Sequence, residues 1–291
     1  MTAGAQRAVV KHLRQKHSLS ERRSCRVAGA TRSSVRYHAR RAEARHLRER
    51  LRELASERPR FGYRRLHVLL GREGLAANHK LVWLVYREEG LVVRRRRRKR
   101  VASVQREPMP IPSRIDELWA LDFVADRLVN GRAFRVLTIV DVLTKECVAI
   151  EVDTSLSGAR VARVLERLAR QGRKPAAIVL DNGPELTSKA LDAFAYANGV
   201  RLRFIEPGRP VQNAFIESFN GKLRDECLSV HWFASLREAQ IVIEAWRRDY
   251  NDVRPHSSLR WQTPAAFAAA VAGAMAPATA TPPTPALPVA R

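Results

Sequence analysis

Residues 118–153 read LWALDFVADRLVNGRAFRVLTIVDVLTKECVAIEVD, and their pattern indicates the fold class. Three runs within it are rich in apolar and β-branched residues: 118–129, 133–143 and 146–153. Asn130 and Gly131 stand between the first two runs, and an Asn-Gly pair is a strong signal of a tight hairpin. The stretch therefore predicts three successive β-strands, the first two joined by a hairpin.

The chain after residue 153 changes repeatedly between helical and strand patterns. Apolar residues at helical spacing predict helices over 158–171 and about 186–198, and two short apolar runs predict strands ending near 180 and 206. A further helix carries Glu217, and helices continue to about residue 270. This order predicts a mixed α/β layer built on one sheet.

Positive charge is concentrated in the first part of the chain. Residues 1–114 hold 31 of the 53 Lys and Arg residues but only 9 of the 29 acidic residues. A formal net charge of +24 attracts polyanions, of which DNA and RNA are the commonest. No apolar run approaches the ~20 residues that cross a bilayer, and no signal-peptide pattern is present. We therefore expect a cytoplasmic, nucleic-acid-binding protein without a membrane partner.

Residues 18–40 have the pattern of two short helices separated by Gly29, which resembles a helix-turn-helix. Arg32, Arg36 and Arg40 recur at helical spacing in the second stretch. They either face DNA or form an ordinary solvated basic surface.

Residues 46–92 contain three helical stripes of apolar residues. The third stripe consists of Leu81, Leu84 and Val85, with Asn78 as the expected N-cap and Gly90 as the expected end. A plain helical domain satisfies this pattern. A DNA-binding helix-turn-helix also explains Arg64, Arg65 and Lys80, which we expect on exposed faces.

A run of seven cations follows the third helix. It consists of Arg94, Arg95, Arg96, Arg97, Arg98, Lys99 and Arg100. No packed core can hold such a run, so it is either an arm that follows a DNA backbone or a solvated linker. Release of counterions by each cation favours the arm.

These patterns divide the chain into five predicted segments. They are a possible helix-turn-helix segment (1–45), a helical DNA-binding domain (46–92), a basic linker (93–114), a catalytic core (115–270) and a disordered Ala/Pro-rich tail (271–291).

Three carboxylates stand out within the predicted core. Asp122 lies in mid-strand among apolar neighbours, where an unpaired charge is costly. Asp181 ends a short buried strand, where functional groups of open α/β sheets collect. If these two strands are adjacent, the two acids face each other at the end of the sheet.

The helix containing Glu217 divides into two arcs on a helical wheel. The packing arc holds Phe215, Ile216, Phe219, Leu223 and Cys227, and the polar arc holds Asn213, Glu217, Asn220 and Arg224. We expect the amides, Arg224 and Lys222 to contact DNA, with Arg224 able to bind a phosphate in bidentate fashion.

The chemistry of phosphodiesters gives these acids a common role. Two hard cations ~3.5–4 Å apart activate the attacking oxygen and stabilise the leaving oxygen, and carboxylates with water hold magnesium. We therefore predict that Asp122, Asp181 and Glu217 hold two Mg²⁺ or Mn²⁺ ions.

Other polar residues have simpler interpretations. The remaining candidate acids are expected at surfaces, turns or helix ends: Asp141, Asp153, Glu185, Asp225 and Glu226. The three cysteines are expected in the core rather than at zinc. Arg254 and His256 either contact DNA or belong to a structural turn.

The motifs LDFVADRLVNGRAFRVLTIVD, VLDNGPEL and FIEPGRPVQNAFIESFNGKLRDECL resemble the catalytic core of bacterial insertion-sequence transposases. The resemblance is to OrfB-type proteins of the insertion-sequence-three family. RFGYRRLHVLLGREG is similar to the family's helix-turn-helix segment, and YNDVRPHSSLRWQTPAAF to its C-terminal signature. The likeness covers about residues 18–267.

This resemblance implies a ribonuclease-H-like mixed sheet flanked by helices, preceded by a small all-α helix-turn-helix region. Asp122, Asp181 and Glu217 match the acidic triad, with the family's 35 residues between the last two. Arg224 matches the downstream basic residue. Asp122 would bridge both ions, and the other two acids would each bind mainly one.

The family's activity is cleavage at the 3′ ends of a mobile element and joining of the freed hydroxyl to another phosphodiester. The implied partners are double-stranded DNA, further copies of the chain and the product of an upstream frame, OrfA, acting at the bacterial nucleoid. The alternatives are a metal-dependent nuclease without strand transfer and an inactive DNA-binding remnant.

Overall fold

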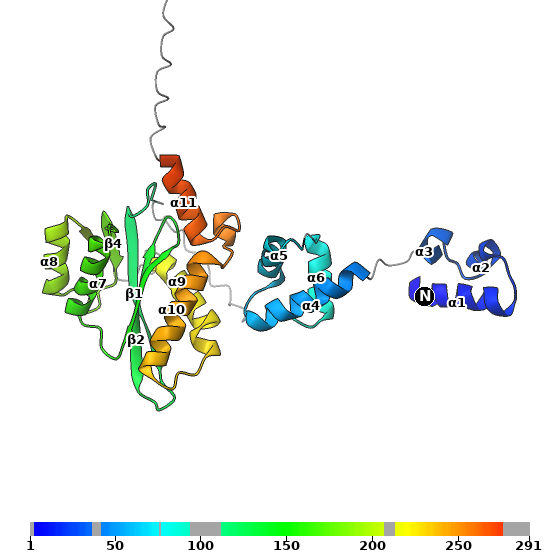
Figure 1. Cartoon of the computed structure of the whole chain (residues 1–291), viewed down its shortest axis with the longest axis horizontal. Helices are drawn as coiled ribbons and strands as arrows, with labels where there is room; N and C mark the ends of the chain where they lie inside the picture. Colours follow the sequence, from blue (N-terminus) through cyan, green and yellow to red (C-terminus); the bar gives the residue numbers. More distant parts are fainter. Residues whose placement is uncertain (1–2, 37–41, 76, 94–111, 207–212, 276–291) are drawn as a thin grey trace, which may run out of the picture. The chain divides into compact units, whose positions relative to one another are not determined.

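The computed structural model describes residues 3–36, 42–75, 77–93, 112–206 and 213–275 (Figure 1). These residues belong to two compact units, Met1–Glu53 and Leu54–Arg291. The five-segment division remains a prediction. The seven-cation run, Arg40 and the tail beyond residue 275 lie outside the described residues.

The first unit is helical. It contains α1 (Ala3–Lys16), α2 (Glu21–Val27), α3 (Arg32–Arg36) and the start of α4 (Ala42–Glu57). The presence of α2 and α3 confirms the two predicted short helices. Gly29, between them, adopts a left-handed φ of +60°. The sequence did not predict α1. Arg36 forms an ion pair of 2.7 Å with Glu21, so its guanidinium has a protein partner.

The second unit begins with the end of α4, followed by α5 (Tyr63–Arg72) and α6 (His79–Glu88). The Asn78 side chain accepts a hydrogen bond from the Lys80 amide at 2.9 Å, and Gly90 has a φ of +67° just beyond α6. Both predicted helix-end signals are therefore confirmed.

The predicted packing stripe of α6 is wrong at two of its three positions. Leu81 and Leu84 are 38% and 47% exposed, and the buried residues are Val82, Val85 and Tyr86. Both sets have helical spacing and share Val85, so periodicity alone did not choose between them. Packing against the rest of the unit determines which set is buried.

The sheet has five strands in the order β3-β2-β1-β4-β5. Their bounds are β1 Leu118–Arg127, β2 Ala133–Asp141, β3 Cys147–Asp153, β4 Ala177–Leu180 and β5 Arg201–Phe204. The first three are antiparallel neighbours, and β4 is parallel to both β1 and β5. All five predicted strands are present, and Gly131 at φ +82° lies in the predicted hairpin.

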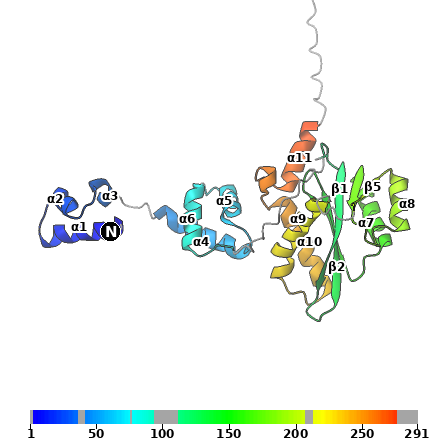
Figure 2. The ribbon, with the colours of Figure 1, turned by 180° about the vertical axis from the view of Figure 1, so that it is seen from behind.

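Helices cover both faces of the sheet (Figures 1 and 2). One face carries α7 (Gly158–Arg170) and α8 (Lys189–Asn198), and the other carries α9 (Ala214–Glu226) and α10 (Leu236–Asp252). The remaining elements are the short helices η2 (Leu228–Val230) and η3 (Ser257–Leu259), and α11 (Pro264–Met275). This is the expected ribonuclease-H-like mixed α/β fold.

Alternation along β1 separates the two cores. Trp119 and Leu121 pack towards α7 and α8, while Leu118 and Ala120 pack towards α9 and α10. Asp122 continues the second series, so its side chain is directed to the α9 face. The fold thus turns a strand carboxylate towards the helix that carries Glu217.

The three cysteines, Cys25, Cys147 and Cys227, are buried and free, as predicted. In the part of the chain that the structure describes, we find no helix with the length and apolar character needed to cross a membrane.

Candidate catalytic site

Asp122 and Asp181 lie at the same level of two adjacent parallel strands. The register of β1 and β4 pairs Leu118 with Ala177 and Ala120 with Val179. Continued by two residues, this register places Asp122 opposite Asp181, which directly follows the last residue of β4. The adjacency of β1 and β4 on which the prediction depended is therefore confirmed. Alternation along β1 directs the Asp122 side chain to the α9 face.

Asp122 is held by hydrogen bonds on both carboxylate oxygens. The Asn220 Nδ2 group donates to Oδ2 at 2.8 Å, and the Phe123 amide donates to Oδ1 at 2.7 Å. The Thr138 hydroxyl lies 3.1 Å from the Asp122 carbonyl and 2.9 Å from Asn220 Oδ1. These contacts fix the carboxylate between β1, β2 and α9.

The other two predicted acids act electrostatically on Asp122. Burial raises the pKa of the half-buried Asp122, the Phe123 amide and Asn220 oppose this shift, and the charges of Asp181 and Glu217 raise the pKa further. Asp181 and Glu217 therefore both lie within electrostatic range of Asp122, and their repulsion of the Asp122 carboxylate favours a positive ion beside it.

Glu217 is exposed in the first part of α9, which begins just after residues outside the described part of the chain. Among the described residues, no group of three or more His, Cys, Asp or Glu side chains is arranged closely enough to hold a metal ion. In this structure the three acids are therefore not close enough together to coordinate one metal ion. Their donor chemistry fits magnesium or manganese, because all donors are hard carboxylate oxygens.

The polar arc of α9 is divided between buried and exposed positions. Asn220 and Asn213 are only 6% and 5% exposed, whereas Glu217 and Arg224 are exposed. The Asn220 amide is committed to Asp122, so its place is inside the site rather than on a free DNA-facing surface. Asn213 Oδ1 is buried without a hydrogen-bond partner among the described residues.

The basic residues predicted to contact DNA differ in their exposure. Arg64 and Lys80 are exposed, as expected. Arg65 is not on an exposed face, because its guanidinium forms an ion pair of 3.1 Å with the largely buried Glu226. Lys222 is partly buried and donates to Ser218 on the preceding turn of α9.

Two of the acids expected at surfaces, turns or helix ends are buried. Asp141, the last residue of β2 at the start of the following turn, is fully buried and accepts hydrogen bonds from the Asp116 and Thr144 amides at 2.8 and 2.7 Å. The Glu226 side chain is only 7% exposed at the end of α9. Their turn and helix-end positions were predicted correctly, but the partners that permit burial were not visible in the sequence.

The segment around Arg254 and His256 is a structural turn. Arg254 is 1% exposed and donates to both Glu226 oxygens, at 2.7 and 2.6 Å. His256 is also buried, and its Nε2 lies 3.3 Å from an Arg254 nitrogen. Of the two interpretations of this pair, the structural one is supported.

Thr138 was missed as a residue of the site, although the sequence contained a signal for it. The Asn130-Gly131 hairpin sets an antiparallel register in which Asp122 pairs with Thr138. Counting outward from that turn finds the residue opposite the mid-strand acid.

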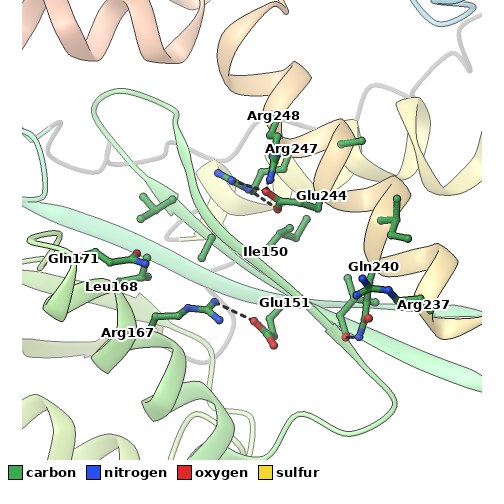
Figure 3. Close-up of a pocket in the computed structure, with 15 residues that line it drawn as sticks. Ile150, Glu151, Arg167, Leu168, Gln171, Arg237, Gln240, Glu244, Arg247 and Arg248 are labelled. Carbon is green, nitrogen blue, oxygen red and sulfur yellow. Dashed lines mark hydrogen bonds and ion pairs between the residues drawn. The ribbon is translucent and has the colours of Figure 1, made fainter.

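A pocket of about 820 Å³ lies between β3, α7 and α10 (Figure 3). Glu151 pairs with Arg167 there, and Glu244 pairs with Arg247 and Arg248. None of the three predicted catalytic acids lines this pocket. Both of its acids are paired with arginines, so the carboxylate cluster is the better candidate site.

Comparison with known protein families indicates the class of protein. Two models of an integrase core domain match residues 112–210 and 198–264, and a model of an HTH-like domain matches residues 42–99.

Similar proteins come from bacterial insertion elements. The chain is 54% identical to an uncharacterized protein of insertion element IS407 from Burkholderia multivorans, over 88% of this chain and 93% of that protein. It is 46% identical to a protein of IS476 from Xanthomonas euvesicatoria, over 90% and 76%. It is 26% identical to the putative transposase InsK of IS150 from Escherichia coli, over 88% and 95%.

The fold and these matches define an enzyme of the transposase and integrase class. The chain belongs to the OrfB-type transposases of the insertion-sequence-three family.

Proposed function

We propose that this protein cleaves the ends of its insertion element and joins the freed 3′-hydroxyl to a second phosphodiester. Asp122, Asp181 and Glu217 hold the two divalent ions on which this chemistry depends. The supporting observation is that Asp122 lies on β1 and Asp181 directly follows the adjacent parallel strand β4, with the Asp122 carboxylate subject to the charge of the other two acids.

Each acid has a distinct local role in this proposal. Asp122 is the fixed member, because Asn220 and the Phe123 amide orient both of its oxygens. Asp181 is anchored at the strand end by the Gly183 amide, which donates to its Oδ1 at 3.1 Å. Glu217 completes the set from α9. Bound divalent ions supply Lewis acidity and lower the pKa of the attacking water or hydroxyl.

Double-stranded DNA is the proposed substrate, as both element end and target. In this proposal Arg224, which is exposed on the same arc of α9 as Glu217, binds a phosphate near the acids. Arg64, Lys80 and the seven-cation run add contacts to the DNA backbone in this proposal. We further propose self-association in the DNA complex and cooperation with the upstream-frame product, at the cytoplasmic nucleoid.

A cleavage and joining assay tests the proposal. The full chain is incubated with a duplex bearing the element end, with magnesium or with a chelator, alongside Asp122→Ala, Asp181→Ala and Glu217→Ala. Loss of a metal ligand removes several kcal/mol of transition-state stabilisation, so each variant should lose on the order of a thousandfold in rate. DNA binding should remain, and the exposed acid variant Asp192→Ala should behave as wild type. Near-normal activity in any triad variant contradicts the proposal.

A precleaved end offered with a target plasmid separates the alternatives. Joined products support a transposase, whereas cleavage without joining identifies a nuclease. DNA binding without any magnesium-dependent reaction identifies an inactive remnant.

A further inference from the structure

A second group of charged side chains contacts α9 apart from the Asp122 site. It lines a pocket of about 240 Å³, and the residues that matter for its chemistry are Arg65, Lys145, Ser218, Lys222, Arg254 and Ser257. None of the three triad acids lines it. The exposed Ser257 lies at its boundary, so the pocket opens to solvent there.

Lys145 is held in position at this pocket. It adopts a left-handed φ of +62° in the turn between β2 and β3. Its ammonium donates to the Val142 carbonyl at 2.6 Å and lies 3.9 Å from the centre of the Phe215 ring. One backbone acceptor leaves further N–H groups of this ammonium for another ligand.

Lys222 brings a second ammonium from α9. Its Nζ donates to the Ser218 carbonyl at 3.1 Å and to the Ser218 hydroxyl at 3.0 Å. Burial lowers the pKa of Lys222 to about 8, helped by the positive charges of Arg254, Arg65 and Lys145. Burial also lowers the pKa of Lys145 to about 8. The cations therefore repel one another across a partly desolvated space.

The acids near this pocket do not neutralise it. Glu226 is bound by both Arg254 and Arg65, and Asp141 is occupied by amide and hydroxyl donors of its turn. Four cations against these two acids leave an excess of two positive charges. His256 adds none near neutral pH, because burial and Arg254 lower its pKa to about 3. A doubly or singly charged anion with several acceptor oxygens fits this excess.

We propose that this pocket binds a phosphate group of DNA, held by Lys145 and Lys222 with hydroxyl donors from Ser218 and Ser257. The inference rests on the proposed function in taking DNA as the source of the phosphate. Lys222 and Glu217 both belong to α9, so a DNA phosphate bound in this pocket would contact the helix that carries the third acid.

Inorganic phosphate provides a first test that does not depend on catalysis. Phosphate should raise the Tm of the full chain in a saturable way, because a ligand that binds only the native state stabilises it. Lys222→Gln and Lys145→Gln should weaken this response at least tenfold, and Lys222→Arg should preserve it. Lys174→Gln removes an exposed lysine outside the pocket and should respond as wild type. Circular dichroism confirms that each variant is folded.

Binding assays with duplex DNA, with and without a 5′-phosphate, identify which DNA phosphate occupies the pocket. An equal loss of affinity for both duplexes in Lys222→Gln, with a salt slope smaller by about 0.9, assigns a backbone phosphate. A loss confined to the 5′-phosphorylated duplex assigns a terminal phosphate. Wild-type responses to phosphate and to both duplexes in folded Lys145→Gln and Lys222→Gln overturn the inference.

The same variants separate this inference from the proposed function. Asp122→Ala should retain the phosphate-dependent rise in Tm although it loses cleavage. If the triad variants keep cleavage while the lysine variants lose phosphate binding, the catalytic proposal fails and the phosphate pocket stands.

Discussion

The side-chain amide of Asn220 donates a 2.8 Å hydrogen bond to Asp122, joining the helix of one predicted catalytic acid to the strand of another. Asn220 also lies 2.9 Å from the Thr138 hydroxyl on the neighbouring strand. These hydrogen bonds therefore link α9 to β1 and β2 and orient the Asp122 carboxylate.

Replacing Asn220 tests this positioning role. Asn220→Ala should cost about 1–3 kcal/mol of stability, because hydrogen bonds to a half-buried carboxylate and to a buried hydroxyl are lost. Partners that orient metal ligands typically contribute ten- to a hundredfold in activity. We therefore expect kcat to fall by about that factor, a higher magnesium requirement and an unchanged KM for DNA.

Asn198→Ala is the matched control, because its amide donates to the Phe194 carbonyl on α8, which packs on the other face of the sheet. An Asn220→Ala variant that loses stability but keeps the wild-type kcat and magnesium dependence shows that Asn220 is only structural.

The buried ion pair between Arg254 and Glu226 should matter for folding. Glu226→Ala leaves the fully buried Arg254 guanidinium without its carboxylate, which costs about 3–5 kcal/mol. Urea unfolding measures the loss. Glu166→Ala breaks the exposed pair with Arg170 and should cost less than about 1 kcal/mol. Equal costs in the two variants contradict this assignment.

Acid stability should depend on His256. Its pKa is about 6.5 in the unfolded chain and is lowered to about 3 in the fold, by burial and by the charges of Arg254 and Lys222. Below pH 6.5 only the unfolded state takes up this proton, so the free energy of unfolding falls by about 1.4 kcal/mol per pH unit down to pH 3.

His256→Gln removes this proton uptake, so the stability of the variant relative to wild type should rise as the pH falls from 6.5 to 3. Comparing the two proteins cancels the other titrating groups. The exposed His79→Gln variant should follow the wild-type profile. Parallel pH profiles of wild type and His256→Gln are the contrary result.

The strand pattern was predictable because its signals are local. Alternating apolar residues and the Asn130-Gly131 turn specify β1 and β2, and their register follows from that turn. The positions of Asp122 and Asp181 at a strand and a strand end also indicated the site. Their shared level required the parallel pairing of β1 with β4, which joins residues about 60 positions apart.

Burial of polar side chains could not be read from the sequence, since it depends on distant partners. Arg65 was expected on an open surface, but Glu226 lies 161 residues away in the chain and against it in space. Asn220 shares a helical arc with Glu217, yet Asn220 is buried against β1 and Glu217 is exposed. A helical wheel gives the direction of each side chain around the helix axis but not which element packs against it.

Anomalous diffraction from manganese, in crystals of the full chain with an element-end duplex, locates the divalent ions relative to the three acids. We expect manganese within about 2–2.5 Å of carboxylate oxygens of Asp122 and Asp181, with Glu217 brought into the same cluster. We also expect these peaks to disappear in Asp122→Ala. Manganese bound elsewhere, with Asp122 and Asp181 making no contact to it, contradicts the proposed metal site.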